Sequence, residues 1–129
     1  MKVSVITVCL NNEKTIENTI LSVLNQNYEN LEYIIIDGGS TDNTKNIIDK
    51  YKKKISTFIS HVDSGIYEAI NKGLSVSTGN IISLLHANDI FFDKNTIKTV
   101  VSYFYKNDIF EVLVGDTIFK NNFLRKKIS

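Results

Sequence analysis

The chain of 129 residues has no proline, no tryptophan, one cysteine and one arginine. A single cysteine, Cys9, excludes an internal disulfide and is typical of a protein kept in a reducing compartment. The formal net charge is +1, so no strong field favours nucleic acid or an acidic partner. These scarcities favour an ordinary soluble domain, and the length suits one domain with one apolar core.

Long hydrophobic runs are also lacking. The apolar runs at 33–37 and 81–85 have the length of a strand and fall far short of the roughly 20 residues of a membrane span. The opening MKVSVITVCL has no small-residue cleavage site, so we expect no signal peptide. Neither G-x-x-x-x-G-K-[ST] nor an early G-x-G-x-x-G is present, which disfavours the two familiar phosphate loops.

Strand-like and helix-like patterns alternate along the chain. Continuous apolar runs predict buried strands at 3–8, 31–36, 57–61 and 80–85, with another near 111–114. Amphipathic spacing predicts helices that begin near 13, 44, 66 and 95, the second of them closed by 52–54. This order predicts an α/β fold: a mostly parallel sheet with helices on both faces.

Polar side chains follow each of the first four predicted strands. In an open α/β sheet, ligands bind beyond the carboxyl ends of the strands. The residues predicted at that edge are Thr7, Asn11, Asp37, His61, Asp63, His86, Asn88 and Asp89. A merely solvated edge is the alternative, because loops are generally polar.

The segment Asp37-Gly38-Gly39-Ser40 is more specific. Its glycines would let the backbone approach a ligand, and its carboxylate could accept from a base or a ribose hydroxyl. A tight turn capped by its own side chains is the alternative. Without a phosphate loop, a bound diphosphate would need a divalent cation, and Asp89 is placed to hold one.

Four segments together resemble a known family. They are TVCLNNEKTI (7–16), DGGSTDNT (37–44), DSGIYEAINKGLSVSTGN (63–80) and LLHANDIF (84–91). In this order and spacing they resemble family 2 glycosyltransferases of the GT-A fold, especially bacterial enzymes of surface-polysaccharide synthesis. The resemblance covers most of residues 3–116, and four segments in register make it specific.

The resemblance implies transfer of a sugar, with inversion, from a nucleotide diphosphate sugar to a glycan or lipid-linked acceptor. A UDP-sugar is favoured as donor and Mn²⁺ or Mg²⁺ as cofactor. The resemblance also implies a cytoplasmic protein, peripheral at the inner face of the membrane, and no nucleic-acid partner. Residues 1–120 would form the nucleotide-sugar-binding domain and 121–129 a polar basic tail.

The resemblance also carries site residues onto this sequence. The nucleotide-sugar-binding candidates are Thr7, Cys9, Glu13, Asp37, Lys72 and Asn88, and the metal candidate is Asp89. Asp37 would accept from the base, and the segment 63–73 would close over the donor with Lys72 near the diphosphate. Simpler interpretations stay open for Glu13 as a first-turn carboxylate, Lys72 as a solvated helix lysine and Cys9 as a small buried filler.

Two departures from the family pattern affect the function. Position 88 is Asn where the family usually has Asp, and an amide adds no charge to a metal site. No carboxylate of the chain is assigned as the general base of an inverting reaction, and Asp116 is interpreted as structural or acceptor-side. The chain therefore matches the donor-binding portion of such an enzyme, which is expected to expose apolar surface and to form a homodimer.

Two other functions compete with this one. The first is a non-catalytic module of the same fold that acts in binding or assembly, which the Asn at position 88 favours. The second is an unrelated flavodoxin-like domain, which the four ordered segments disfavour. Metal-dependent nucleotide binding separates the glycosyltransferase hypothesis from both.

Overall fold

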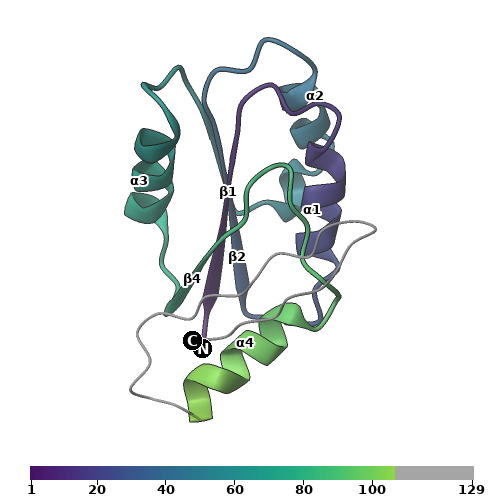
Figure 1. Ribbon diagram of the computed structural model, residues 1–129, viewed down its shortest axis with the longest axis vertical. Helices are drawn as coiled ribbons and strands as arrows, with labels where there is room; N and C mark the ends of the chain where they lie inside the picture. Colours follow the sequence, from purple (N-terminus) through teal and green to yellow (C-terminus); the bar gives the residue numbers. More distant parts are fainter. Residues whose placement is uncertain (107–129) are drawn as a thin grey trace, which may run out of the picture.

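The computed structural model describes residues 1–106 of the chain. Four strands form one parallel sheet in the order β3-β2-β1-β4 (Figure 1). Their bounds are β1 (Val3–Cys9), β2 (Leu31–Asp37), β3 (Thr57–Ser60) and β4 (Ile81–Leu84). The prediction of a parallel sheet is confirmed, and each strand lies within two residues of its predicted bounds at either end.

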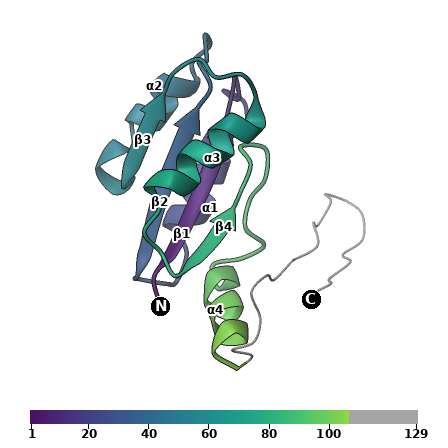
Figure 2. The same cartoon turned by 90° about the vertical axis from the view of Figure 1, so that its left-hand side faces the viewer.

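Helices cover both faces of the sheet. Their bounds are α1 (Ile16–Leu24), α2 (Thr44–Asp49), α3 (Ile66–Val76) and α4 (Thr96–Lys106). α1 and α2 lie on one face and α3 on the other, while α4 lies near the amino ends of the strands (Figures 1 and 2). The change of face follows from the strand order: the chain steps outward from β1 to β3 and then returns across the sheet to β4.

The second helix differs from its prediction. Residues Lys52–Lys54 were expected to close it, but α2 ends at Asp49 and these lysines form a separate 3-10 turn. The backbone N–H groups of Lys50 and Tyr51 already bond to carbonyls three residues back, which tightens the chain out of the α-helical pattern. The predicted strand near 111–114, Asp116 and the tail 121–129 lie outside the described residues.

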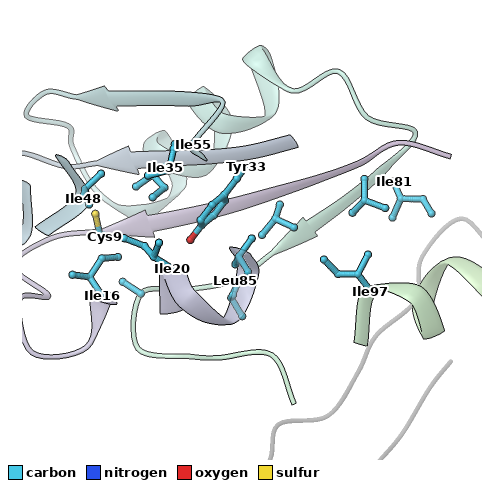
Figure 3. Packing of buried hydrophobic residues seen from close by; sticks show 14 of the residues in the cluster. Cys9, Ile16, Ile20, Tyr33, Ile35, Ile48, Ile55, Ile81, Leu85 and Ile97 are labelled. Carbon is cyan, nitrogen blue, oxygen red and sulfur yellow. The ribbon is translucent and has the colours of Figure 1, made fainter. Parts of the chain in front are cut away.

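The core has two parts, one on each face. The larger contains Val5 and Cys9 from β1, Tyr33 and Ile35 from β2, and residues of α1, α2 and α4 (Figure 3). The smaller packs Ile6, Val8, Ile34 and Ile36 against Ala69 of α3. β1 and β2 are central, so both of their faces are buried, which explains their uninterrupted apolar sequences.

None of the helices within residues 1–106 combines the length and the apolar character that crossing a membrane requires.

Candidate functional site

The four loops that follow the strands meet at one edge of the sheet, the upper edge in Figure 1. A cavity of about 250 Å³ lies there. It is bounded by the end of β1, the loops after β2 and β3, the start of α3 and the loop after β4; its lining includes Cys9, Leu10, Asn12, Gly38, Asp63, Ile66, His86 and Asn88. β1 is the strand at which the chain reverses direction across the sheet, so the cavity occupies the usual ligand position of an open α/β fold.

Asp37 organises one wall of this edge and is itself fully buried. Its carboxylate accepts from the backbone N–H groups of Gly39 (3.1 Å) and Ser40 (2.9 Å), and from the hydroxyls of Ser40 and Ser60. The Cys9 thiol donates to the same carboxylate across 3.4 Å. Burial alone would raise the pKa of Asp37, but these hydrogen bonds outweigh it and hold the pKa below its ordinary value.

These contacts support the tight-turn alternative for the segment 37–40. Gly39 adopts φ 98°, a left-handed conformation that glycine accepts readily, so the turn folds back over its own carboxylate. Asp37 is fully buried in this conformation, and the expectation that it accepts from a base stays a prediction.

Two further candidates face the core. Thr7 is fully buried within β1, and its hydroxyl shares a 2.9 Å hydrogen bond with the Tyr33 hydroxyl. Strand alternation turns Thr7 to the same side as Val5 and Cys9, so its side chain faces the core, and its role in the nucleotide pocket stays a prediction. Cys9 is 7% exposed and contributes to the cavity wall, but its thiol bonds to Asp37. Burial, then the charge of Asp37, raises the pKa of Cys9, which keeps the thiol protonated.

Glu13 and Lys72 do not line the cavity. Glu13 lies before α1, where its backbone N–H donates to Asp42 across 3.2 Å. Lys72 lies in the middle of α3, three residues beyond Ala69, the last residue of that helix to line the cavity.

Asp89 lies at the edge with an exposed side chain. Its backbone is held firmly: its N–H donates to the His86 carbonyl (2.9 Å), and its carbonyl accepts from the Thr19 hydroxyl (2.7 Å). Thr19 is fully buried in α1 and also contacts the Ala87 carbonyl, so α1 anchors the loop that presents Asp89. Within residues 1–106, the Asp89 carboxylate makes no hydrogen bond or ion pair.

The donor set suits a cation that shares a ligand's phosphates. Mg²⁺ and Mn²⁺ are commonly held by one or two carboxylates together with phosphate oxygens. Among the residues that the structure describes, no three His, Cys, Asp or Glu side chains gather to hold a metal by themselves. Asp89, whose carboxylate has no partner within residues 1–106, therefore fits such a shared cation.

Asp63 was predicted at this edge, and its segment was expected to cover the donor, but it was given no individual role in binding. Its Oδ1 accepts from the Gly65 N–H (3.2 Å), while its Oδ2 is buried without a partner. In the part of the chain from 1 to 106, Asp63 Oδ2 is the one buried side-chain oxygen or nitrogen that lacks a hydrogen bond. It lies about 3.0 Å from the place where a Cβ on Gly38 would stand, so a side chain there would press on this carboxylate. The sequence feature that could have indicated such a role for Asp63 is the run Asp63-Ser64-Gly65 immediately before the predicted helix.

A second hollow of about 450 Å³ lies on the outer side of α1 and shares Asn88 with the cavity. Its lining has no charged side chain, so it lacks the groups that a diphosphate and its cation require.

Solved structures share this architecture. A crystal structure of S. aureus TarS in complex with UDP-GlcNAc has a TM-score of 0.78 and 26% identity, over 84% of this chain and 32% of that chain. Glucosyl-3-phosphoglycerate synthase from Mycobacterium tuberculosis, in complex with Mn²⁺, UDP and phosphoglyceric acid, has a TM-score of 0.65 and 25% identity, over 78% and 38%. The fold is therefore that of a GT-A glycosyltransferase domain.

Sequence comparison gives the family. The family model described as glycosyl transferase family 2 matches residues 4–129, so the chain belongs to that family. An uncharacterized glycosyltransferase of Haemophilus influenzae is 37% identical over 109 residues, which are 82% of this chain and 33% of that protein. The chain thus spans about a third of the length of that relative.

Proposed function

We propose that this chain binds the nucleotide diphosphate sugar of an inverting glycosyl transfer in the cavity at the carboxyl edge of the sheet. The favoured donor is a UDP-sugar, and the acceptor is a glycan or a lipid-linked sugar. Two observations on similar proteins support the donor class: TarS binds UDP-GlcNAc, and the mycobacterial synthase binds UDP with Mn²⁺. Neither bears on the acceptor.

The observation that carries the proposal is Asp63 Oδ2, a buried carboxylate oxygen without a hydrogen-bond partner within residues 1–106. A buried acceptor without a partner costs about 1–3 kcal/mol, and a ligand that donates to it recovers that cost. A carboxylate accepts and does not donate, so it suits a ligand with an N–H or O–H donor, such as the N–H of a uracil ring or a ribose hydroxyl. Gly38 lets this carboxylate lie close to the turn after β2, because a Cβ at position 38 would stand about 3.0 Å from Asp63 Oδ2.

Asp89 would hold a divalent cation together with the donor's phosphates. The cation, when bound, would offset the charge of the diphosphate as it leaves the sugar. The chain's own contribution is to fix the loop that carries Asp89, through Thr19 and the His86 carbonyl. None of the 129 residues is assigned as the general base.

The test is a thermal melt with UDP, GDP and ADP, each with and without MnCl₂. Ligand at 100 times its Kd stabilises the folded state by about 2.7 kcal/mol, which is a shift of several degrees in Tm. We expect UDP to give that shift with Mn²⁺, and Asp89→Asn to remove the Mn²⁺-dependent part. Asp49→Asn is the matched control, because Asp49 is also exposed but lies in α2. The absence of any shift with every nucleotide would contradict the proposal.

The alternative is a non-catalytic module of the same fold that acts in binding or assembly. The observation that favours it is the Asn at position 88, because an amide adds no charge to a metal site. It predicts self-association with no nucleotide-dependent change in Tm.

A further inference from the structure

The loop that carries Asp89 is tied to α1 at more points than Thr19. It leaves β4, passes along α1 and reaches α4 (Figure 1). Three side chains bond to its main chain on the way: Thr19 and Ser22 of α1, and Gln26, which lies two residues beyond the end of that helix. The backbone groups that they contact belong to every second residue of the loop, namely Ala87, Asp89, Phe91 and Asp93.

Ser22 makes the middle contact. Its hydroxyl donates to the Thr19 carbonyl across 2.8 Å, so its single hydrogen is occupied and its lone pairs are free to accept. The backbone N–H of Phe91 donates to this oxygen across 3.2 Å. Ser22 lies three residues after Thr19 in α1, so the two side chains are neighbours on the same side of the helix.

Gln26 joins the end of the loop to α4. Its Oε1 accepts from the N–H of Ile97 (3.0 Å), which lies in the first turn of α4, where backbone N–H groups have no partner within the helix. A backbone N–H only donates, so this bond fixes which end of the amide is the oxygen. The –NH₂ end donates to two carbonyls, those of Ser22 (3.1 Å) and Asp93 (2.6 Å). Gln26 therefore uses both ends of its amide to hold α1, the loop and α4 together.

These bonds go to the main chain of the loop, so they set its course independently of the side chains that the loop carries. Mg²⁺ demands near-ideal octahedral geometry, so a carboxylate that is displaced holds it less well. From this we infer that Ser22 and Gln26 are positioning residues, which together with Thr19 hold the Asp89 carboxylate where it can share a cation with the donor's phosphates. This inference rests on the function proposed above.

The hydrogen bonds are tested first without any ligand, by amide hydrogen exchange of the 129-residue chain followed by NMR. The loss of one neutral hydrogen bond corresponds to a change of about threefold to tenfold in an equilibrium constant. We expect Ser22→Ala to lower the protection of the Phe91 amide by that factor. The Asp89 amide, which donates to a carbonyl of its own loop, should lose protection in the same variant. Gln26→Met should lower the protection of the Ile97 amide.

Ser102→Ala is the matched control for Ser22→Ala. Ser102 is also half-buried in a helix and also donates to a carbonyl three residues back, that of Thr99 (2.6 Å). Within residues 1–106 it bonds to no other element, so its replacement should leave the exchange of Phe91 and Asp89 unchanged. Exchange of Phe91 in Ser22→Ala that equals the exchange in the wild type would overturn the inference.

The positioning role is tested next by the metal-dependent part of UDP binding. Isothermal titration with UDP, with and without MnCl₂, gives the factor by which Mn²⁺ tightens binding. We expect Ser22→Ala and Gln26→Met to reduce this factor by about threefold to tenfold. Ser22→Thr keeps the hydroxyl and should retain the wild-type factor. A purely structural role would lower Tm and leave the factor unchanged.

The outcomes separate this inference from the proposed function. If the wild type gains nothing from Mn²⁺, the proposed function of Asp89 is wrong and the inference falls with it. If the wild type gains and both Ser22→Ala and Gln26→Met keep the gain, the proposed function stands and the inference is overturned. A loss in Ser22→Thr as large as that in Ser22→Ala would also overturn it, because the hydroxyl would then have no part in the effect.

Discussion

At the scale of single residues, Asp37 connects three strands at the site. Its carboxylate receives donors from β1 (Cys9), from its own turn (Ser40) and from β3 (Ser60). The turn that these bonds hold contains Gly38, which lines the cavity next to Asp63. We therefore interpret Asp37 as a buried residue that fixes the conformation of the turn after β2, and through that turn the position of Gly38 in the cavity wall.

Asp37→Asn tests this role. The amide cannot accept through its nitrogen, so buried donors lose their partner, and we expect a loss of about 2–3 kcal/mol in the free energy of unfolding at pH 7. Urea denaturation measures it, with Asp49→Asn as a control that should be nearly neutral.

The same residue predicts a pH dependence. The folded-state pKa of Asp37 lies below its ordinary value of about 3.9, so its stabilisation is complete above that value and is lost as the pH falls through the folded-state pKa. The gap in unfolding free energy between the wild type and Asp37→Asn should therefore be constant from pH 7 to 5 and shrink below about pH 4. A gap that is unchanged at pH 3 would show that the Asp37 charge contributes nothing.

The sequence predicted which polar residues follow the strands, but not which of them are buried or what they bond to. The sequence singled out Asp37, Asn88 and Asp89 because each follows a recognisable strand. It could not give the burial of Asp37, since the donors on Ser60 and Cys9 are brought there only by the fold. It likewise missed the hydroxyl pair of Thr7 and Tyr33, which needs the register in which β1 lies beside β2.

At the scale of elements, α3 forms the wall of the cavity opposite the loop after β4. Gly73 lets α3 approach β1 closely: a Cβ on Gly73 would stand 2.6 Å from Ile6 Cγ2. The start of the same helix lines the cavity through Gly65, Ile66 and Ala69. The separation of α3 from the sheet therefore sets the width of the site.

Gly73→Ala should push α3 away from β1. We expect a net loss of about 1–3 kcal/mol in unfolding free energy, because overpacking outweighs the better helix propensity of alanine. Ser75→Ala in the same helix is the control: Ser75 is exposed, so its change should be neutral or slightly stabilising. If Gly73→Ala were as stable as Ser75→Ala, the close packing of α3 on Ile6 would be contradicted.

Elements were the most predictable level. Continuous apolar runs and 3.6-residue periodicity depend on neighbouring residues alone, so β1, β2 and α1 could be located from the sequence. The end of α2 was mispredicted because a run of three lysines suits a helix terminus and a 3-10 turn equally well.

At the scale of the whole molecule, β4 is an edge of the described sheet. Ile82 is 39% exposed and Leu84 is 47% exposed on this strand, and Leu74 of α3 is 42% exposed. Edge strands with exposed apolar side chains favour pairing with another chain. The expected homodimer stays a prediction, with β4 as its contact.

Sedimentation velocity tests this prediction. We expect the wild type to sediment as a dimer at micromolar concentration and Leu84→Lys to shift it to the monomer. Ile90→Lys is the control, because Ile90 is 59% exposed but lies in the loop after β4. A wild type that is monomeric at all concentrations, or a dimer that Leu84→Lys leaves intact, would contradict β4 as the contact.

The central claim is that the cavity between β1 and the loop after β4 binds the nucleotide of the donor. NMR titration of the labelled 129-residue chain with UDP and Mg²⁺ tests it most directly. The account predicts shifts of the amide resonances of Gly38, Asp63, Ala87 and Asn88, and broadening centred on Asp89 when Mn²⁺ replaces Mg²⁺. Unchanged spectra, or shifts confined to α4 and the outer face of α1, would contradict it.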